Sequence, residues 1–383
     1  MQNPDLLIVG AGPVGCVVAE RTSRLLGWKC LVIDKRNHHS GNCFDTTHPS
    51  GIRIHRYGPH YFRTNKKQIV DYLSEFTGWV PGNYIVKCSV NRELFPFPIN
   101  LNTLRRFFKR DFTPKSAKAF LDGKKEKIDV PKNSEEFVLS RVGRELYEAF
   151  YLGYTLKQWG KHPRELDPSV CGRIPIRFNE VETYVDHKYQ ILPAGGYSEM
   201  FAKMIDQEGI EVRLGIDYKD LRGEIRPRKA TLYTGPVDEY FGFKLGKLPW
   251  RSLDFQFTEY KREFFQQCVQ INYPNEHDYT RSVEIKHVTR QKHSHTVVSY
   301  EFPKSAGDPY YPVPAPENRS LYEKYRVLAE EETIKNRVYF AGRLAEYTYI
   351  NTDEAIEKAL AVFERIRRDF HDRSALGGNA RLQ

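Results

Sequence analysis

At 383 residues the chain is longer than one hydrophobic core usually supports, so we expect two or three domains. Hydrophobic residues make up 40% of it, yet no stretch approaches the roughly 20 apolar residues of a membrane helix, and the N-terminus lacks a signal-like pattern, which predicts a cytoplasmic protein without a membrane span. The formal charge of +10 invites a nucleic-acid interpretation, but the phenylalanines of the basic cluster at 105–110 recur at helical spacing with leucines, so we expect no nucleic-acid partner.

The first 45 residues carry the strongest local pattern. An apolar run at 6–9 precedes Gly10-Ala-Gly12-Pro-Val-Gly15, and a second apolar run ends at Asp34. This order predicts a strand, a glycine turn, a helix and a strand ending in an acid, which together bind a dinucleotide. Gly10 would allow the tight turn, Gly12 the approach of a pyrophosphate and Gly15 close packing of helix on strand, while Asp34 would reach an adenosine ribose. A simple glycine turn is the alternative.

The middle of the chain changes character twice. Residues 100–154 are predicted to be mostly helical, with Ser134 as the cap of one helix, and residues 184–300 are predicted to form mainly strands. Between them, Gly195-Gly196 precedes an expected helix at 198–208 that returns to the nucleotide fold. The cofactor domain should therefore be discontinuous.

The C-terminal part of the chain indicates whether the bound dinucleotide is FAD or NAD. Residues 338–343 read as a short buried strand and residues 353–366 as an amphipathic helix, whose N-terminus would offer N–H groups to the flavin end of FAD. An NAD domain usually completes its site within one contiguous half. The alternative is an ordinary strand and helix that close a sheet.

These patterns predict an α/β fold in which a discontinuous Rossmann-like FAD-binding domain carries an inserted helical-bundle domain and an inserted antiparallel β-sheet domain. We assign 1–75, 190–235 and 325–370 to the FAD-binding domain, 100–172 to the helical domain, 76–99, 173–189 and 236–324 to the sheet domain, and 371–383 to a disordered tail. The six cysteines are scattered without a CxxC pair, so we expect no metal site and no disulfide framework.

Several long motifs make the chain similar to a known family from Leu6 to about Ile366. They are Lys35-Arg-Asn-His, Gly41-Asn42, His55-Arg-Tyr-Gly-Pro-His60-Tyr-Phe-Arg63-Thr-Asn65, Tyr154-Thr-Leu-Lys-Gln-Trp159-Gly160, Arg173-Ile-Pro-Ile-Arg177-Phe and Gly342-Arg343-Leu-Ala-Glu346-Tyr347. In these motifs the chain resembles UDP-galactopyranose mutase.

The resemblance implies an isomerase that interconverts the pyranose and furanose forms of a nucleotide sugar, most simply UDP-galactopyranose and UDP-galactofuranose. In that family N5 of reduced FAD attacks the anomeric carbon, the diphosphate leaves, the ring opens and recloses, and the diphosphate returns, so the cofactor carries the covalent catalysis. Expected partners are the nucleotide sugar and an external reductant such as NAD(P)H or a reductase. A homodimer and a role in polysaccharide biosynthesis are also implied.

The resemblance also implies roles for individual residues. The residues expected to act in catalysis are Arg173, Arg281, His60 and Arg63. Those expected to bind substrate are Tyr154 stacking on the base, Thr155, Trp159, Arg173, Tyr184, Asn272, Arg281, Tyr311, Tyr349 and Asn351. Those expected to hold the cofactor are Gly10, Gly12, Gly15, Asp34, Lys35, Asn42, His60, Gly342, Arg343 and Asp353. Residues 161–177 should form a mobile lid that carries Arg173.

Three departures from the family pattern concern the cofactor turn and the substrate. Ser40 replaces the first glycine of a usual Gly-Gly-Asn, Arg63 replaces a common histidine, and Asn351 replaces an aspartate. The sequence at residues 84–89 also differs from the sequence that is usual in the family at this position. These changes leave UDP-N-acetylgalactosamine or another nucleotide sugar, such as a GDP- or dTDP-linked 6-deoxyhexose, as alternative substrates. An FAD amine oxidase or dehydrogenase and a non-catalytic flavin-binding protein are the alternatives outside the family.

Overall fold

The computed structural model describes residues 3–172 and 174–377, with side chains through residue 370. A five-stranded parallel sheet forms its nucleotide-binding half, in the order β10-β2-β1-β11-β17. Its strands are β1 (Leu6–Val9), β2 (Cys30–Asp34), β10 (Ile210–Leu214), β11 (Ala230–Tyr233) and β17 (Val338–Phe340). Because these strands come from three separate stretches of the chain, the Rossmann-like domain is discontinuous, as predicted.

Both faces of this sheet are covered. Leu6 and Ile8 of β1 belong to the core under α1 (Pro13–Leu26), α9 (Tyr197–Ile205) and α14 (Thr352–Gly377). Leu7 and Val9 point to the opposite face, toward α10 (Tyr218–Leu221) and α11 (Val237–Tyr240). Burial on both faces explains why β1 is apolar throughout instead of alternating. Helix α14 continues to Gly377, so the disordered tail expected from residue 371 is wrong at its start.

A seven-stranded sheet forms the second region, in the order β16-β12-β15-β14-β13-β7-β8. Its strands are β7 (Val86–Val90), β8 (Glu93–Phe97), β12 (Trp250–Tyr260), β13 (Gln270–Asn272), β14 (Arg281–Val283), β15 (Thr296–Lys304) and β16 (Tyr311–Pro312). The sheet was expected to be antiparallel, and all its pairs are so except β13 with β7, which is parallel. The exception arises because β13 enters beside β7 from a distant part of the chain.

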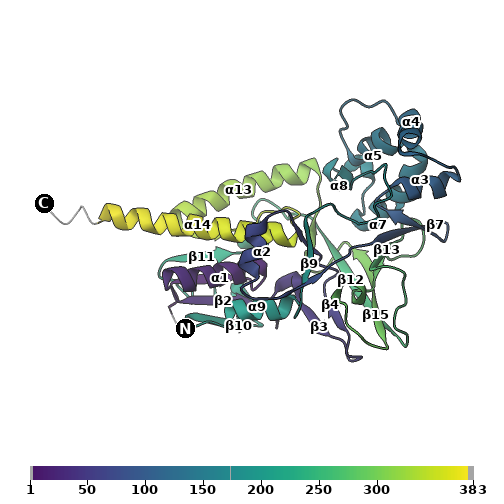
Figure 1. Ribbon diagram of the computed structural model, residues 1–383. Coiled ribbons are helices and arrows are strands. Elements are labelled where there is room, and N and C mark those ends of the chain that lie inside the picture. Colours follow the sequence, from purple (N-terminus) through teal and green to yellow (C-terminus); the bar gives the residue numbers. More distant parts are fainter. Residues whose placement is uncertain (1–2, 173, 378–383) are drawn as a thin grey trace.

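A helical region packs against β7 and β8 and lies at the end of the molecule away from the C-terminus (Figure 1). Its helices are α3 (Leu101–Phe108), α4 (Pro114–Lys124), α5 (Ser134–Val142), α6 (Arg144–Tyr147), a π-helical turn at Glu148–Leu152, α7 (Gly153–Trp159) and α8 (Ser169–Gly172). The cap of α5 is Asn133, whose side chain accepts from the Glu136 N–H, and not Ser134 as predicted. Both residues are capping types, so the sequence placed the helix start one residue late.

Short elements join these regions. They are β3 (Asp45–Thr47), β4 (Arg53–His55), β5 (Phe62–Thr64), β6 (Trp79–Pro81), β9 (Tyr189–Pro193), α2 (Lys67–Leu73), α12 (Lys286–Thr289), α13 (Pro316–Asn336) and the 3₁₀ turns Gly41–Cys43 and Pro163–Glu165. Helix α14 runs above α1 in Figure 1, with α13 beside it, and Arg365 of α14 pairs with Glu330 of α13. No helix of the described residues is long and apolar enough to cross a membrane.

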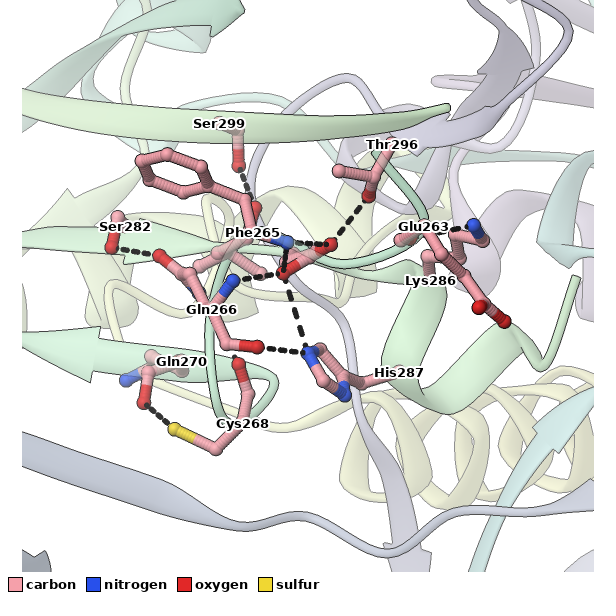
Figure 2. A network of polar contacts seen from close by, with 12 residues as sticks. Glu263, Phe265, Gln266, Cys268, Gln270, Ser282, Lys286, His287, Thr296 and Ser299 are labelled. Carbon is pink, nitrogen blue, oxygen red and sulfur yellow. Dashed lines mark hydrogen bonds and ion pairs between the residues drawn. The ribbon is translucent and has the colours of Figure 1, made fainter. Parts of the chain in front are cut away.

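A buried polar network stiffens the entrance to β13 (Figure 2). The fully buried Glu284 carboxylate accepts from the backbone N–H groups of Phe265 and Gln266 and from the Thr296 hydroxyl. Farther along the same segment, the Cys268 thiol donates to the Gln270 carbonyl over 3.2 Å. A buried carboxylate is tolerated only when its oxygens are satisfied. The segment that precedes β13 is therefore held in place by buried groups.

Candidate functional site

The structure shows which glycines of the turn have no room for a side chain. A Cβ on Gly10, whose φ is +107°, would lie 2.0 Å from Thr234 Oγ1, and a Cβ on Gly15 would lie 1.9 Å from the Gly10 carbonyl oxygen. A Cβ on Gly12 would meet nothing nearer than Gly41 Cα at 3.8 Å. The protein itself thus requires Gly10 and Gly15 to be glycine, whereas the space at Gly12 stays open at the N-terminus of α1. Such an open helix N-terminus suits a phosphate group.

Asp34 ties the turn to the end of β2. Its two carboxylate oxygens accept from the backbone N–H groups of Ala11, at 2.8 Å, and Arg36, at 2.9 Å. These bonds fix the carboxylate at the carboxyl end of the strand, where parallel α/β sheets bind their ligands. The remaining lone pairs are available to a ribose hydroxyl.

A cleft of about 230 Å³, here called the glycine cleft, opens between this turn and the residues around Gly342. Its walls include most of the predicted cofactor residues, namely Gly10, Gly12, Asp34, Lys35, Asn42, His60, Gly342 and Arg343. Gly15 lies beneath the turn instead of in the wall. Asp353 is not in the wall either, because its carboxyl interacts with Thr64 and Arg63, and burial raises its pKa.

Sequence reasoning missed the far end of the glycine cleft. Ile216, Tyr218, Tyr233 and Tyr240 line it beyond Asp34. The rings of Tyr233 and Tyr240 pack edge to face with centroids 5.0 Å apart, and both side chains are buried, so they form an aromatic floor at this end of the cleft. These tyrosines are spread over α10, β11 and α11, so no single motif identified them.

Ser40 explains why glycine is usual at its position. It is fully buried and has a φ of 71°, in the left-handed region that disfavours residues with a Cβ. Its backbone N–H donates to the Ala11 carbonyl at 2.7 Å, and its hydroxyl bonds His39 Nδ1 at 2.8 Å. Local hydrogen bonds therefore hold the serine in this conformation.

A second, larger cleft of about 410 Å³ lies between the seven-stranded sheet and the helical region, and is here called the tyrosine cleft. Its walls bring together the predicted residues His60, Arg63, Tyr154, Thr155, Trp159, Tyr184, Asn272, Arg281, Tyr311, Tyr349 and Asn351. Arg173, which was expected to reach this cleft from a mobile lid, lies outside the described residues. Chain segments more than 280 residues apart thus meet in one cavity, as between Arg63 and Asn351.

The two clefts share a wall. His60, Arg343, Asn42, Asn351 and Thr352 line both of them. Molecules filling the two clefts would therefore lie next to each other at these residues. This is the geometry needed for a cofactor that reacts directly with a substrate.

His60 is held as a neutral ring in this wall. Its Nδ1–H donates to the Gly58 carbonyl at 3.0 Å, which leaves Nε2 as an acceptor. Burial, followed by the positive charge of Arg343, lowers the pKa of His60 to about 3. The ring therefore offers an acceptor, and no proton, near neutral pH.

A buried ion pair presents Arg281 to the tyrosine cleft. The Arg281 Nε–H donates to Glu301 at 2.6 Å, and another guanidinium nitrogen donates to the Tyr311 hydroxyl at 3.3 Å. Burial opposes the charged form of Arg281, but Glu301, Tyr154 and Tyr311 raise its pKa well above the usual value. The guanidinium thus stays charged in a setting where anions are bound strongly.

Glu301, the ion-pair partner of Arg281, is a residue that the sequence analysis missed. Its side chain is fully buried, and it lies directly opposite Arg281 in the pairing of β14 with β15. A lone acid inside the otherwise apolar and hydroxyl-bearing run at 296–302 was the signal that could have found it. Buried acids in such runs need a partner, and Arg281 provides it.

Helix α7, which carries Tyr154, Thr155 and Trp159, is anchored by Lys157. The Lys157 ammonium reaches the backbone carbonyls of Tyr273, Glu276 at 3.0 Å, and His277 and Tyr279, both at 3.1 Å. Burial lowers its pKa to about 8. The lysine therefore joins the helix to the loop that connects β13 with β14, whose ends carry Asn272 and Arg281.

Arginine and tyrosine groups also cluster where the clefts meet. The Arg343 guanidinium carbon lies 5.0 Å from the Tyr349 ring centroid, and Tyr349 stacks against Tyr311 at 5.8 Å. Nearby, Arg63 donates to the Asn351 side-chain oxygen at 3.1 Å, and the Asn351 amide nitrogen donates to Glu354 at 2.9 Å. The two departures from the family pattern, Arg63 and Asn351, therefore act as one hydrogen-bonded pair.

Comparison with known proteins agrees with this geometry. A family model described as UDP-galactopyranose mutase matches residues 149–349, and one described as an NAD(P)-binding Rossmann-like domain matches residues 8–76. The chain is 37% identical over 367 residues to a probable UDP-galactopyranose mutase of Klebsiella pneumoniae, which covers 94% of each chain. It belongs to the UDP-galactopyranose mutase family.

Two further relatives show the range of this family. A dTDP-fucopyranose mutase of Escherichia coli is 33% identical over 369 residues, covering 93% of this chain and 96% of the relative. A crystal structure of reduced UDP-galactopyranose mutase matches with a TM-score of 0.74 at 16% identity, covering 96% of both chains, and supports the fold. Membership of the UDP-galactopyranose mutase family identifies the chain as an isomerase of this type.

Proposed function

We propose that the chain is a mutase that requires reduced FAD and interconverts the pyranose and furanose forms of a nucleotide sugar, with UDP-galactose as the first candidate. The observation that carries this proposal is the shared wall of His60 and Arg343 between the two clefts. The glycine cleft would hold FAD, and the tyrosine cleft would hold the nucleotide sugar with its sugar toward the shared wall.

The residues of the glycine cleft fit FAD. The open space at Gly12 and the free N-terminus of α1 suit the pyrophosphate, Asp34 suits the ribose, and the neutral His60 lies at the flavin end. Bound there in its reduced form, FAD would supply a nucleophilic nitrogen, N5, for covalent catalysis at the sugar.

The chain's own residues manage the diphosphate. Arg281 is charged, anchored by Glu301 and close to the Tyr311 hydroxyl, so it would stabilise the negative charge that grows as the diphosphate leaves. Tyr349 and Arg343 would retain the diphosphate until it returns. Tyr154 would support the base, and closure of the cleft, with Arg173 on the proposed lid, would exclude water.

Arg63 and Asn351 favour a second candidate substrate. Their hydrogen bond places a permanent positive charge and an amide in the wall of the tyrosine cleft, where the family more commonly has histidine and aspartate. UDP-N-acetylgalactosamine or a dTDP-linked 6-deoxyhexose therefore remains the alternative, and the dTDP-fucopyranose mutase relative supports including the latter.

An anaerobic assay with dithionite-reduced protein tests these proposals. UDP-galactopyranose, UDP-N-acetylgalactosamine and dTDP-fucopyranose are each offered, and products are separated by chromatography. Furanose product, together with the mass of the offered sugar on the flavin after cyanoborohydride trapping, would support the mutase chemistry and identify the sugar. In a separate aerobic assay of the oxidised protein, peroxide formation with amines, combined with the absence of furanose product from the reduced protein, would instead favour an oxidase.

Other features of the proposal follow from the family alone. We expect a homodimer, a cytoplasmic location and an external reductant such as NAD(P)H. Sedimentation of the purified protein and anaerobic reduction by NADPH would check the first and the last.

A further inference from the structure

Two side chains of β13 form a polar pair in the wall of the tyrosine cleft. Gln270 and Asn272 are both buried and both line this cleft. They lie two residues apart and so share one face of the strand, and Asn272 lies directly opposite Arg281 in β14. The pair therefore belongs to the same sheet face that presents Arg281.

The hydrogen bonds of this pair run in one direction. The Tyr61 hydroxyl donates to Gln270 Oε1 at 3.3 Å, and Gln270 Nε2 donates to Asn272 Oδ1 at 2.8 Å. The acceptor of the Asn272 amide is thus used, and among the described residues its nitrogen makes no hydrogen bond to protein. Asn272 is left with N–H donors for whatever enters the cleft.

The hydrogen-bonded series Tyr61–Gln270–Asn272, here called the relay, is held at both ends before any ligand binds. Tyr61 stacks on Tyr84 with ring centroids 4.4 Å apart, and the Tyr84 hydroxyl is bonded to backbone at Ile191 over 2.8 Å. The start of β13 is held by the network of Figure 2, in which Cys268 donates to the backbone oxygen of Gln270. The donor presented by Asn272 is therefore preorganised and costs little ordering when a ligand binds.

We propose that Gln270 is a specificity-determining positioning residue, which turns the Asn272 amide so that the nucleotide site accepts a pyrimidine with a carbonyl oxygen and rejects one with an amino group. This inference rests on the proposed function, because it assumes that the base of a nucleotide sugar lies beside Asn272. It predicts that uridine and thymidine diphosphates both bind and that cytidine diphosphate is excluded.

The chemistry follows from donor and acceptor matching. Uracil and thymine carry a carbonyl at ring position 4, which accepts from an amide N–H, whereas cytosine carries an amino group there. If cytosine entered the site, its amino group and the Asn272 amide N–H would face each other as two donors. Each would lose its hydrogen bond to water and gain no replacement. Unpaired groups of this kind reduce affinity at least about tenfold.

Two substitutions of Gln270 test the relay. In Gln270→Glu the carboxylate has only acceptors, so the Asn272 nitrogen turns toward it and the Asn272 oxygen faces the cleft. In Gln270→Met no polar group remains to orient the amide. Binding of UDP, dTDP and CDP to the oxidised holoprotein is measured by calorimetry, so that the readout does not require turnover.

We expect the native protein to prefer UDP and dTDP over CDP by at least about tenfold. Gln270→Glu should reverse this order, and Gln270→Met should bring the three affinities to within about threefold of one another. Gln267→Glu is the matched control, because Gln267 is exposed in the same segment and bonded only by Lys87 at 3.0 Å. It should keep the native preference.

The outcomes separate this inference from the proposed function. An unchanged preference in Gln270→Met protein that holds its flavin would overturn the role of Gln270 and leave the mutase proposal intact. Failure of the native protein to bind UDP and dTDP would overturn the proposed nucleotide-sugar function itself.

Discussion

The two clefts are built in different ways. Around Gly10 and Gly12 the glycine cleft is built from backbone: a turn of glycines, the N-terminus of α1 and the carboxyl ends of parallel strands. The tyrosine cleft is made of side chains from β5, α7, β13, β14 and the segment before α14. A backbone site needs space, whereas a side-chain site needs charges and hydrogen bonds oriented by neighbouring groups. Substitutions in the two clefts should therefore impair the protein in different ways.

The largest effect is expected for Arg281→Lys in the tyrosine cleft. Lysine keeps the positive charge beside Glu301 but loses the planar fork that also reaches Tyr311. Turnover should fall by about 10²- to 10³-fold, because stabilisation of the departing diphosphate is lost, while flavin content is unchanged. Steady-state kinetics on reduced protein measure the effect, with Arg262→Lys on the exposed surface as the control. Turnover within threefold of native would remove Arg281 from the mechanism.

A pair of glycine substitutions tests the glycine cleft. Gly12→Ala should weaken FAD binding by about 10- to 100-fold and leave the stability of the apoprotein intact, because its Cβ meets no protein atom within 3.4 Å. Gly15→Ala should instead destabilise the fold, since its Cβ would lie 1.9 Å from the Gly10 oxygen. Flavin fluorescence and thermal unfolding of the apoproteins distinguish the two. Equal loss of apoprotein stability would show that Gly12 serves packing.

A smaller effect is expected from Lys157→Met, which changes a residue behind the tyrosine cleft. Methionine fills similar space but leaves the carbonyls around Glu276 and Tyr279 without their cation. Tyr154 should then be held less firmly, raising the Kd for UDP by about tenfold with little change in FAD binding. Titration with UDP provides the measurement, and Lys118→Met, on the exposed face of α4, is the control. A fall in kcat without a change in Kd would contradict a positioning role.

The smallest effect concerns pH and the shared wall. Burial first of all lowers the pKa of His60 to about 3 and of His55 to about 4, below the usual 6.5. The unfolded chain therefore binds protons more readily than the folded protein does. The contribution of these two neutral rings to the free energy of unfolding is complete above pH 6.5, and it is lost as the pH falls toward 4 and 3. Urea unfolding between pH 7.5 and 4.5 should show this decline. His60→Asn, which keeps a donor for Gly58, should flatten it.

The same contrast explains what the sequence revealed. Gly10, Gly12, Gly15 and Asp34 fall within 25 consecutive residues, and their spacing alone predicted the turn, the strand end and the open helix terminus. Backbone geometry of this kind depends on local residues, and the uninterrupted apolar runs on either side of the turn agree with a parallel sheet that is buried on both faces.

The tyrosine cleft was accessible only through the family motifs. No periodicity indicates that Arg281 and Glu301 pair across two strands, that Lys157 reaches a loop more than 110 residues away, or that Gln270 orients Asn272. Each depends on strand register and tertiary packing, which arise after local structure forms. The parallel pairing of β13 has the same origin, whereas the one-residue error at the cap of α5 arose because Asn133 and Ser134 are both capping types.

The surroundings of Lys157 have a further consequence. Four backbone carbonyls around one cation resemble the coordination that proteins use for potassium or sodium, but here the cation is covalently part of α7. An ion bound in such a loop would leave on dilution and exchange with the salts of the medium. The tethered ammonium cannot, so the junction between α7 and the loop that leads into β14 should keep its shape whatever monovalent ions the solution contains.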